Sequence, residues 1–99
     1  MKRFGEIIAF YSDNNDYVYV LQSQIDNSWY IGYTNNLKKR IIEHNSGKTI
    51  TTNKKKPYSL IYCEAALDKS DAIAREKYLK SGMGRKYLKN RLKFQFENL

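Results

Sequence analysis

Three ionisable side chains fall at helix positions where apolar residues would pack better: Arg40, His44 and Glu76. The spacing of apolar residues over 37–44 predicts a helix in which His44 shares the apolar side and Arg40 borders it. Glu76 lies on the apolar stripe of a second predicted helix. Because an unpaired charge is expensive to bury, each of these side chains needs a partner, a metal ion or a chemical role.

Each of the three also has a purely structural interpretation. A single histidine such as His44 is more often held in a core by ordinary hydrogen bonds, and Arg40 is a common type of surface helix residue. Glu76 has a lysine four residues further on, which can form a helical ion pair with it. A chemical role becomes the better explanation only when these residues are taken together with Tyr19 and Tyr30.

Two strand-like segments precede the first helix and carry the two tyrosines. Aromatic and β-branched residues predict strands over about 17–23 and 28–34. The turn-forming pair Asp26-Asn27 between them predicts an antiparallel hairpin. The tyrosines are therefore expected on neighbouring strands, immediately before the helix that carries the arginine and the histidine.

The residues after the hairpin position that helix. Gly32 shares a face of the second strand with Tyr30 and leaves it open, so that a backbone or a ligand can come close. Thr34 or Asn35 is expected to cap the helix, and Gly47 to end it. Thus the hairpin and the helix together are expected to hold most of the site.

The remaining chain predicts one more strand and two more helices. A polar loop over 48–56 leads to a strand over 58–66. The helix that carries Glu76 ends at Gly82, and Gly84 gives a second break before a basic helix over 85–93. The order strand, strand, helix, strand, helix, helix predicts an α+β fold, a small three-stranded antiparallel or mixed sheet flanked by helices.

The bulk composition points to a polyanionic partner. The 99 residues carry 18 Lys+Arg against 10 Asp+Glu, a formal net charge of +8. A small domain this basic usually meets nucleic acid, and less often an anionic membrane surface; an inert basic surface is the alternative. The side chains expected to contact backbone phosphates are Lys48, Lys54, Lys55, Lys56, Arg85, Lys86, Lys89 and Arg91. The alternative for the lysines of the 48–56 loop is that they simply face water.

The chain is expected to work in the cytoplasm as one domain. It contains one cysteine, Cys63, which suits a reducing compartment. We identify no membrane span and no signal peptide in the sequence. We expect an accessory segment over 1–16, the functional domain over 17–93 and a tail over 94–99.

Two short motifs resemble a known signature. Val18-Tyr19 and Tyr30-Ile31-Gly32 are similar to the two halves of the GIY-YIG nuclease motif. The second half matches in full, whereas the first half reads YVY because Tyr17 stands where the family usually has glycine. The likeness extends from Asp16 to about Leu92 and is strongest with the small stand-alone bacterial members of the family. The same core is similar to the nuclease domains of UvrC-type repair enzymes and homing endonucleases.

The resemblance assigns roles to all five candidate residues. The family's arginine falls on Arg40, its histidine on His44 and its metal-binding glutamate on Glu76. It implies that Glu76 holds one Mg²⁺ or Mn²⁺ and that Arg40 grips the phosphate. Tyr19 would act as general base on the attacking water, and Tyr30 and His44 would orient it or relay the proton. We expect the five to converge on one concave surface.

The activity implied by the resemblance is metal-dependent hydrolysis of phosphodiesters in DNA, with RNA possible. We expect preference for DNA structure or weak sequence selectivity, in repair or recombination, because 99 residues leave no room for a base-reading module. Two alternatives stay open. The chain could be a nucleic-acid-binding module of the same fold with little catalysis. It could also be a subunit that works with a protein partner in a larger nuclease complex, or as a homo-oligomer.

Overall fold

The computed structural model of the protein describes residues 15–49 and 52–94. Most of the expected accessory segment, 1–16, and most of the expected tail, 94–99, lie outside the described residues. The elements in chain order are β1 (Asp16–Ser23), β2 (Trp29–Thr34), α2 (Leu37–Asn45), the 3₁₀ turn η1 (Asn53–Lys55), β3 (Tyr58–Ala66), α3 (Lys69–Lys80) and α4 (Gly82–Arg91).

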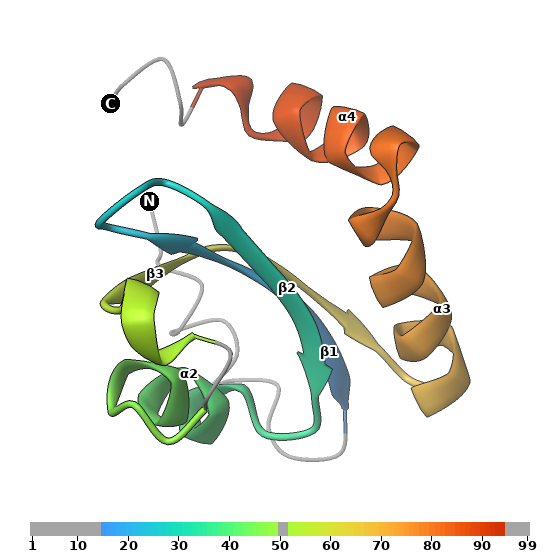
Figure 1. Ribbon diagram of the computed structural model, residues 1–99. Helices are drawn as coiled ribbons and strands as arrows, with labels where there is room; N and C mark the ends of the chain where they lie inside the picture. The colour runs from blue at the N-terminus through green and yellow to red at the C-terminus, as the bar shows by residue number, and fades with distance from the viewer. Residues whose placement is uncertain (1–14, 50–51, 95–99) are drawn as a thin grey trace.

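Three antiparallel strands in the order β2-β1-β3 form the central layer. Helix α2 lies below the sheet in Figure 1, whereas α3 and α4 lie to its right and above it. The α+β prediction is therefore confirmed, and the sheet is antiparallel. Among the described residues, no helix is long and apolar enough to cross a membrane.

Alternation along β1 divides its side chains between the two helical layers. One face of β1 carries Tyr17, Tyr19 and Leu21, which are buried in a cluster with Leu37 of α2. The other face carries Val18 and Val20, which belong to the cluster on the opposite side of the sheet. A strand with both faces covered is the geometry that makes a continuous run of apolar residues stable. β1 is thus the central strand, with β2 and β3 paired on its two sides and a buried cluster on each of its faces.

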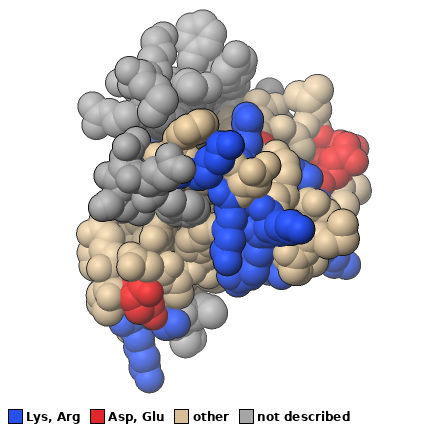
Figure 2. Space-filling view, turned by 90° about the horizontal axis from the view of Figure 1, so that it is seen from above, with Lys and Arg blue, Asp and Glu red and all other residues tan. Residues whose placement is uncertain are grey.

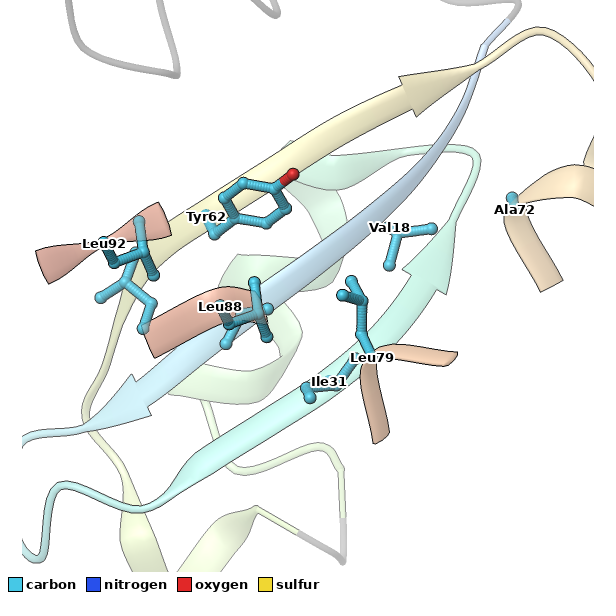
Figure 3. Close-up of a cluster of buried hydrophobic side chains, with 9 residues drawn as sticks. Val18, Ile31, Tyr62, Ala72, Leu79, Leu88 and Leu92 are labelled. Atoms are coloured by element: carbon cyan, nitrogen blue, oxygen red, sulfur yellow. The ribbon is translucent and has the colours of Figure 1, made fainter. Parts of the chain in front are cut away.

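The larger core lies between the sheet and the pair α3 and α4. Figure 3 shows Leu79 and Leu88 pointing from these helices towards Val18 and Ile31 of the sheet. Val18, Leu79 and Leu88 have no exposed surface. Burying one such aliphatic side chain contributes about 1.5–3 kcal/mol. This core therefore fixes α3, the helix that carries Glu76, against the strands.

A mixed polar and aromatic cluster adds to the attachment of α3. The guanidinium of Arg75 donates from Nε to Oε1 of Glu64 on β3 at 2.6 Å. The same guanidinium lies over the ring of Tyr87 of α4, 4.8 Å from its centroid. The side chain of Arg75, which directly precedes Glu76 in the sequence, thus joins α3 to both β3 and α4.

The cap of α2 differs from the prediction. Asn36 is the N-cap, and its side-chain oxygen accepts from the backbone N–H of Lys39 at 3.2 Å. Thr34 instead accepts from the Asn36 N–H at 3.1 Å, which shapes the turn before the helix. The expectation that Thr34 or Asn35 caps the helix is wrong, because Thr34 still belongs to β2 and α2 begins at Leu37, directly after Asn36. Gly47, with a φ of 82°, follows the helix as expected.

Gly84 is not a helix break. Ser81 ends α3 and caps α4, accepting from the Gly84 N–H at 3.1 Å. Gly84 is buried, and a Cβ there would collide with the carbonyl of Tyr78 and lie 2.5 Å from Cα of Leu79. The glycine is needed because the start of α4 packs directly on the backbone of α3. The helix therefore begins at Gly82, three residues earlier than predicted.

Candidate active site

The strand tyrosines and the helix histidine meet on the α2 side of the sheet. The hydroxyl of Tyr19 lies 2.9 Å from Nε2 of His44, in a fully buried hydrogen bond. The ring of Tyr30 packs on the imidazole with 4.7 Å between centroids, and the two tyrosine rings are 6.2 Å apart. The prediction that Tyr19, Tyr30 and His44 lie close together agrees with these distances.

Gly32 provides the space for this arrangement. It is the register partner of Tyr19 across the β1–β2 pair. A Cβ on Gly32 would lie 2.6 Å from the hydroxyl oxygen of Tyr19 and 2.8 Å from Cζ. Any side chain at this position would push the phenol ring away from the imidazole. The glycine of the YIG motif is thus needed for close approach and not for an unusual φ.

His44 is held from both sides. Its second ring nitrogen, Nδ1, lies 2.8 Å from the hydroxyl of Thr52, a residue with no exposed surface. Thr52 is not predicted from the sequence, because the most conspicuous residues of the 48–56 loop are its lysines. The available signal was that a buried imidazole requires two partners, and the loop after α2 offers several threonine hydroxyls.

The hydrogen bonds determine which nitrogen carries the proton. The hydroxyl of Thr52 donates to the backbone carbonyl of Thr49 at 3.5 Å, so its oxygen accepts from Nδ1 of His44. Nδ1 therefore carries the imidazole proton. Nε2 is then bare and accepts the proton of the Tyr19 hydroxyl. We assign His44 this tautomer from the network of partners.

Burial sets the protonation of both groups. It raises the pKa of Tyr19 to about 12, and the contact with Arg40, which acts in the opposite direction, does not offset it. Burial, and after it the positive charge of Arg40, lowers the pKa of His44 below its usual 6.5. At neutral pH the pair is therefore a neutral phenol donating to a neutral imidazole.

Arg40 lies at the border between this buried pair and solvent. It forms an ion pair with Glu43 across one helical turn at 3.4 Å, and its side chain is 37% exposed. An open groove of about 480 Å³ begins beside it and extends over Thr34 at the end of β2 to Lys69 at the start of α3. Arg40 thus presents a cation to the groove and contacts the Tyr19 hydroxyl behind it.

Glu76 reaches the site from the other helical layer. It belongs to α3, which packs on β1 and β2 from the face opposite α2. Its carboxylate pairs with Lys80 at 3.0 Å, and its negative charge is near enough to help raise the pKa of Tyr19. Of the five residues expected on one concave surface, the structure brings four together beside α2, namely Tyr19, Tyr30, Arg40 and His44. Glu76 lies in the helical layer on the opposite face of the sheet.

The donor set fits a hydrated cation better than an enclosed one. Within residues 15–49 and 52–94, no three His, Cys, Asp or Glu side chains gather as ligands. Mg²⁺ and Mn²⁺ prefer oxygen ligands, and Mg²⁺ keeps several waters while bound through one or two carboxylates. Glu76, 18% exposed, can supply one such oxygen once it shares or releases its partner Lys80.

The eight basic residues expected to contact phosphates form two groups on different layers. One follows α2 and includes Lys55, which pairs with Asp26 at 3.3 Å. The other lies on α4, where Figure 2 shows basic side chains gathered on the face seen from above. The members of the first group are Lys48, Lys54, Lys55 and Lys56, and those of the second are Arg85, Lys86, Lys89 and Arg91.

A family model described as the GIY-YIG catalytic domain matches residues 15–93. The chain belongs to the GIY-YIG family. It is 44% identical over 68 residues to the UPF0213 protein YazA of Bacillus subtilis, which covers 68% of each chain. It is 40% identical over 85 residues to a UPF0213 protein of Pediococcus acidilactici, covering 80% of this chain and 86% of the relative. The solved structure of UPF0213 protein BH0048 from Bacillus halodurans shows 36% identity and a TM-score of 0.48, covering 75% and 81%.

Membership of the GIY-YIG family places the chain among nucleases, proteins that bind nucleic acid and generally use a divalent metal ion. The match begins one residue before β1 and ends after α4, so it includes both tyrosines and every helix described above. The resemblance seen in the YVY and YIG motifs is thereby confirmed.

The lowered pKa of His44 predicts a pH dependence of stability. Below pH 6.5 the unfolded chain takes up a proton on this imidazole, whereas the folded chain does not. The free energy of unfolding should be highest above pH 6.5 and should fall as the pH drops towards the folded-state pKa. His44 is the one histidine of the sequence, so urea unfolding between pH 7 and 5 reports on it cleanly.

The control for this measurement is His44→Gln, which has no group titrating in that range. Its free energy of unfolding should be lower at pH 7 but nearly constant from pH 7 to 5. If wild type and the variant lost stability in parallel over this range, the buried neutral imidazole would be disproved.

Proposed function

We propose that the protein is a metal-dependent endonuclease that hydrolyses phosphodiester bonds of DNA, with selectivity for structure or weak selectivity for sequence. A role in repair or recombination within the cytoplasm fits this activity. The observation that carries the proposal is the buried series Tyr19, His44 and Thr52 ending beside an exposed arginine. Such a series can accept a proton at its outer end, next to a group that binds phosphate.

Arg40 is the residue that would bind the scissile phosphate. A guanidinium has five N–H donors, of which the weak pair with Glu43 occupies one. The remaining donors can bind two phosphate oxygens at once, an arrangement stronger than a single neutral hydrogen bond. The same cation would neutralise the charge that builds up on these oxygens in the transition state.

Tyr19 would take the proton from the attacking water without becoming a phenolate. As the water gives one proton to the phenol oxygen, the phenol gives its own proton to Nε2 of His44. Two O–H bonds break and one O–H and one N–H bond form, so hydroxide and an imidazolium result. The pKa of about 12 is no obstacle, because His44 and not Tyr19 keeps the proton.

Three other residues support this transfer. Thr52 holds the imidazole in the tautomer that leaves Nε2 free to accept. Tyr30 packs on the ring and fixes its plane. Glu76 would hold the Mg²⁺ or Mn²⁺, which supplies Lewis-acid stabilisation of the leaving oxygen when bound. The negative charge of Glu43 would favour the imidazolium form of His44.

One observation favours a second candidate function. Within the described residues no three His, Cys, Asp or Glu side chains gather as metal ligands, and the Glu76 carboxylate is already paired with Lys80. A domain of this fold that binds nucleic acid with little catalysis, alone or as a subunit of a larger nuclease, would need no metal site at all. Cleavage by the isolated chain separates the two functions.

The first test replaces Tyr19 by phenylalanine. This removes the outer end of the proton path, so Mn²⁺-dependent nicking of supercoiled plasmid and of branched DNA should fall by about 10²-fold or more. The matched control is Tyr17→Phe, two residues earlier on the same strand. The hydroxyl of Tyr17 is buried without a hydrogen-bond partner among the described residues, so its loss should leave nicking unchanged. Equal nicking by Tyr19→Phe and wild type would refute the assigned base.

A second test separates the two roles open to Glu76. Glu76→Gln and Lys80→Gln both break the ion pair, but only the first removes the metal-binding oxygen. Each should lower the free energy of unfolding by about 0.5 kcal/mol or less, because Lys80 is 55% exposed. Glu76→Gln should abolish nicking while retaining DNA binding, and Lys80→Gln should retain both. A Glu76→Gln protein that melts much lower and still nicks would show that Glu76 is structural.

A further inference from the structure

A long basic segment ends the described chain. Residues 77–94 contain no aspartate or glutamate. Their basic side chains are Lys77, Lys80, Arg85, Lys86, Lys89, Arg91 and Lys93. Four of them lie on α4 itself: Arg85, Lys86, Lys89 and Arg91. All four are exposed, and none forms an ion pair with a carboxylate in the part of the chain that the structure describes. Figure 2 shows the resulting basic surface.

Helix stability does not account for all of these charges. Lys89 and Arg91, in the last turn of α4, interact favourably with the helix dipole. Arg85 lies in the first turn of the helix, where a cation is disfavoured and where no acidic residue balances it. Lys86 lies in the middle of the helix, beyond the turns over which the dipole acts. A partner that offers negative charge would offset this cost.

The basic surface of α4 is separate from the groove beside Arg40. That groove ends at Lys69, the first residue of α3, whereas α4 begins after the last residue of α3. Helix α3 is 12 residues long, which at 1.5 Å per residue is about 18 Å. In addition α2 and α4 lie in different layers, with the sheet between them (Figure 1).

We propose that α4 is a second nucleic-acid-binding surface, which binds the phosphate backbone of a second arm of a branched DNA while the groove beside Arg40 holds the first. This inference rests on the DNA binding in the proposed function, but not on cleavage. It gives the expected preference for DNA structure a physical basis, because two separated surfaces favour a substrate with two duplex arms over a straight one.

The apolar residues of α4 favour DNA over a membrane surface. A helix that binds in the lipid interface buries its apolar side among the acyl chains. In α4 and just after it, Leu88 and Leu92 are buried in the protein core, 0% and 7% exposed. Met83, at the start of α4, is the one large exposed apolar side chain of the helix itself, and Phe94, three residues beyond its end, is also exposed. The exposed side thus offers charge for phosphates and little apolar surface for lipid.

The test removes two charges from α4 and measures the salt dependence of binding. Lys86→Gln combined with Lys89→Gln changes two exposed residues that are three apart, and glutamine keeps the helix propensity of lysine. Binding is measured in EDTA from low to moderate salt. The probes are a linear duplex of about 12 base pairs, roughly 40 Å long, and a four-way junction with arms of that length. The control is Lys38→Gln combined with Lys39→Gln on α2, where both lysines are exposed and Lys39 lines the groove beside Arg40. It removes the same charge from the first surface.

We expect the α4 variant to reduce the slope of log K against log salt by about 1.8 on the junction, at about 0.9 per lost phosphate contact, and to leave the slope on the linear duplex unchanged. The α2 variant should reduce both slopes. Equal reductions by the α4 variant on both probes would indicate one continuous surface and overturn the inference, as would no change on either.

A membrane role is tested by sedimentation with vesicles of anionic and neutral phospholipid. Loss of vesicle binding in the α4 variant, with both DNA slopes unchanged, would assign the surface to lipid and overturn the inference. The nuclease proposal can fail independently. A protein that binds junctions through α4 and never nicks them would support this surface and refute the catalytic assignment.

Discussion

The hydrogen bond between Tyr19 and His44 is the interaction on which the rest of the site depends. It lies in the layer between the sheet and α2, in a cluster of otherwise apolar and aromatic side chains. A buried phenol and a buried imidazole are costly unless both are satisfied, and each is satisfied by the other. Gly32 provides the room for the ring, and Thr52 supplies the second partner of the imidazole.

Burial gives this pair its chemical character. It keeps Tyr19 protonated and His44 neutral, so the pair cannot act through a free phenolate. The neutral imidazole of His44 can instead accept a proton through the phenol of Tyr19, and this phenol lies next to Arg40. The layer of α3 and α4, on the other face of the sheet, has a mainly structural role. Its apolar core and the contacts of Arg75 hold α3 rigidly, which places Glu76 close enough for its charge to act on Tyr19.

Much of the fold follows from local sequence patterns, because alternation and capping act within a few residues. The hairpin around Asp26-Asn27 and the strand over 58–66 are found where they were predicted. The error at Gly84 is at a position decided by a tertiary contact. Gly84 looks like a break in sequence, but it is a helical residue pressed against the backbone of α3.

The candidate site could be predicted in part, because local sequence patterns also identify some of its residues. Periodicity identifies His44 and Glu76 as polar residues on apolar faces, and the motifs identify the tyrosines. Thr52 carries no such signal, since its role appears only when the loop folds back over α2. Nor does sequence reveal that the basic residues divide between two layers, because their distance along the chain says nothing about which side of a sheet they occupy.

The tautomer of His44 tests the central claim most directly. The protein has one histidine, so a long-range ¹H–¹⁵N NMR spectrum contains one pair of imidazole nitrogens to assign. The account predicts a neutral ring at pH 7 with the proton on Nδ1 and a bare Nε2 that accepts from Tyr19, and a ring that remains mostly neutral at pH 6.5. A proton on Nε2, or an imidazolium titrating with the pKa of an exposed histidine, would contradict it.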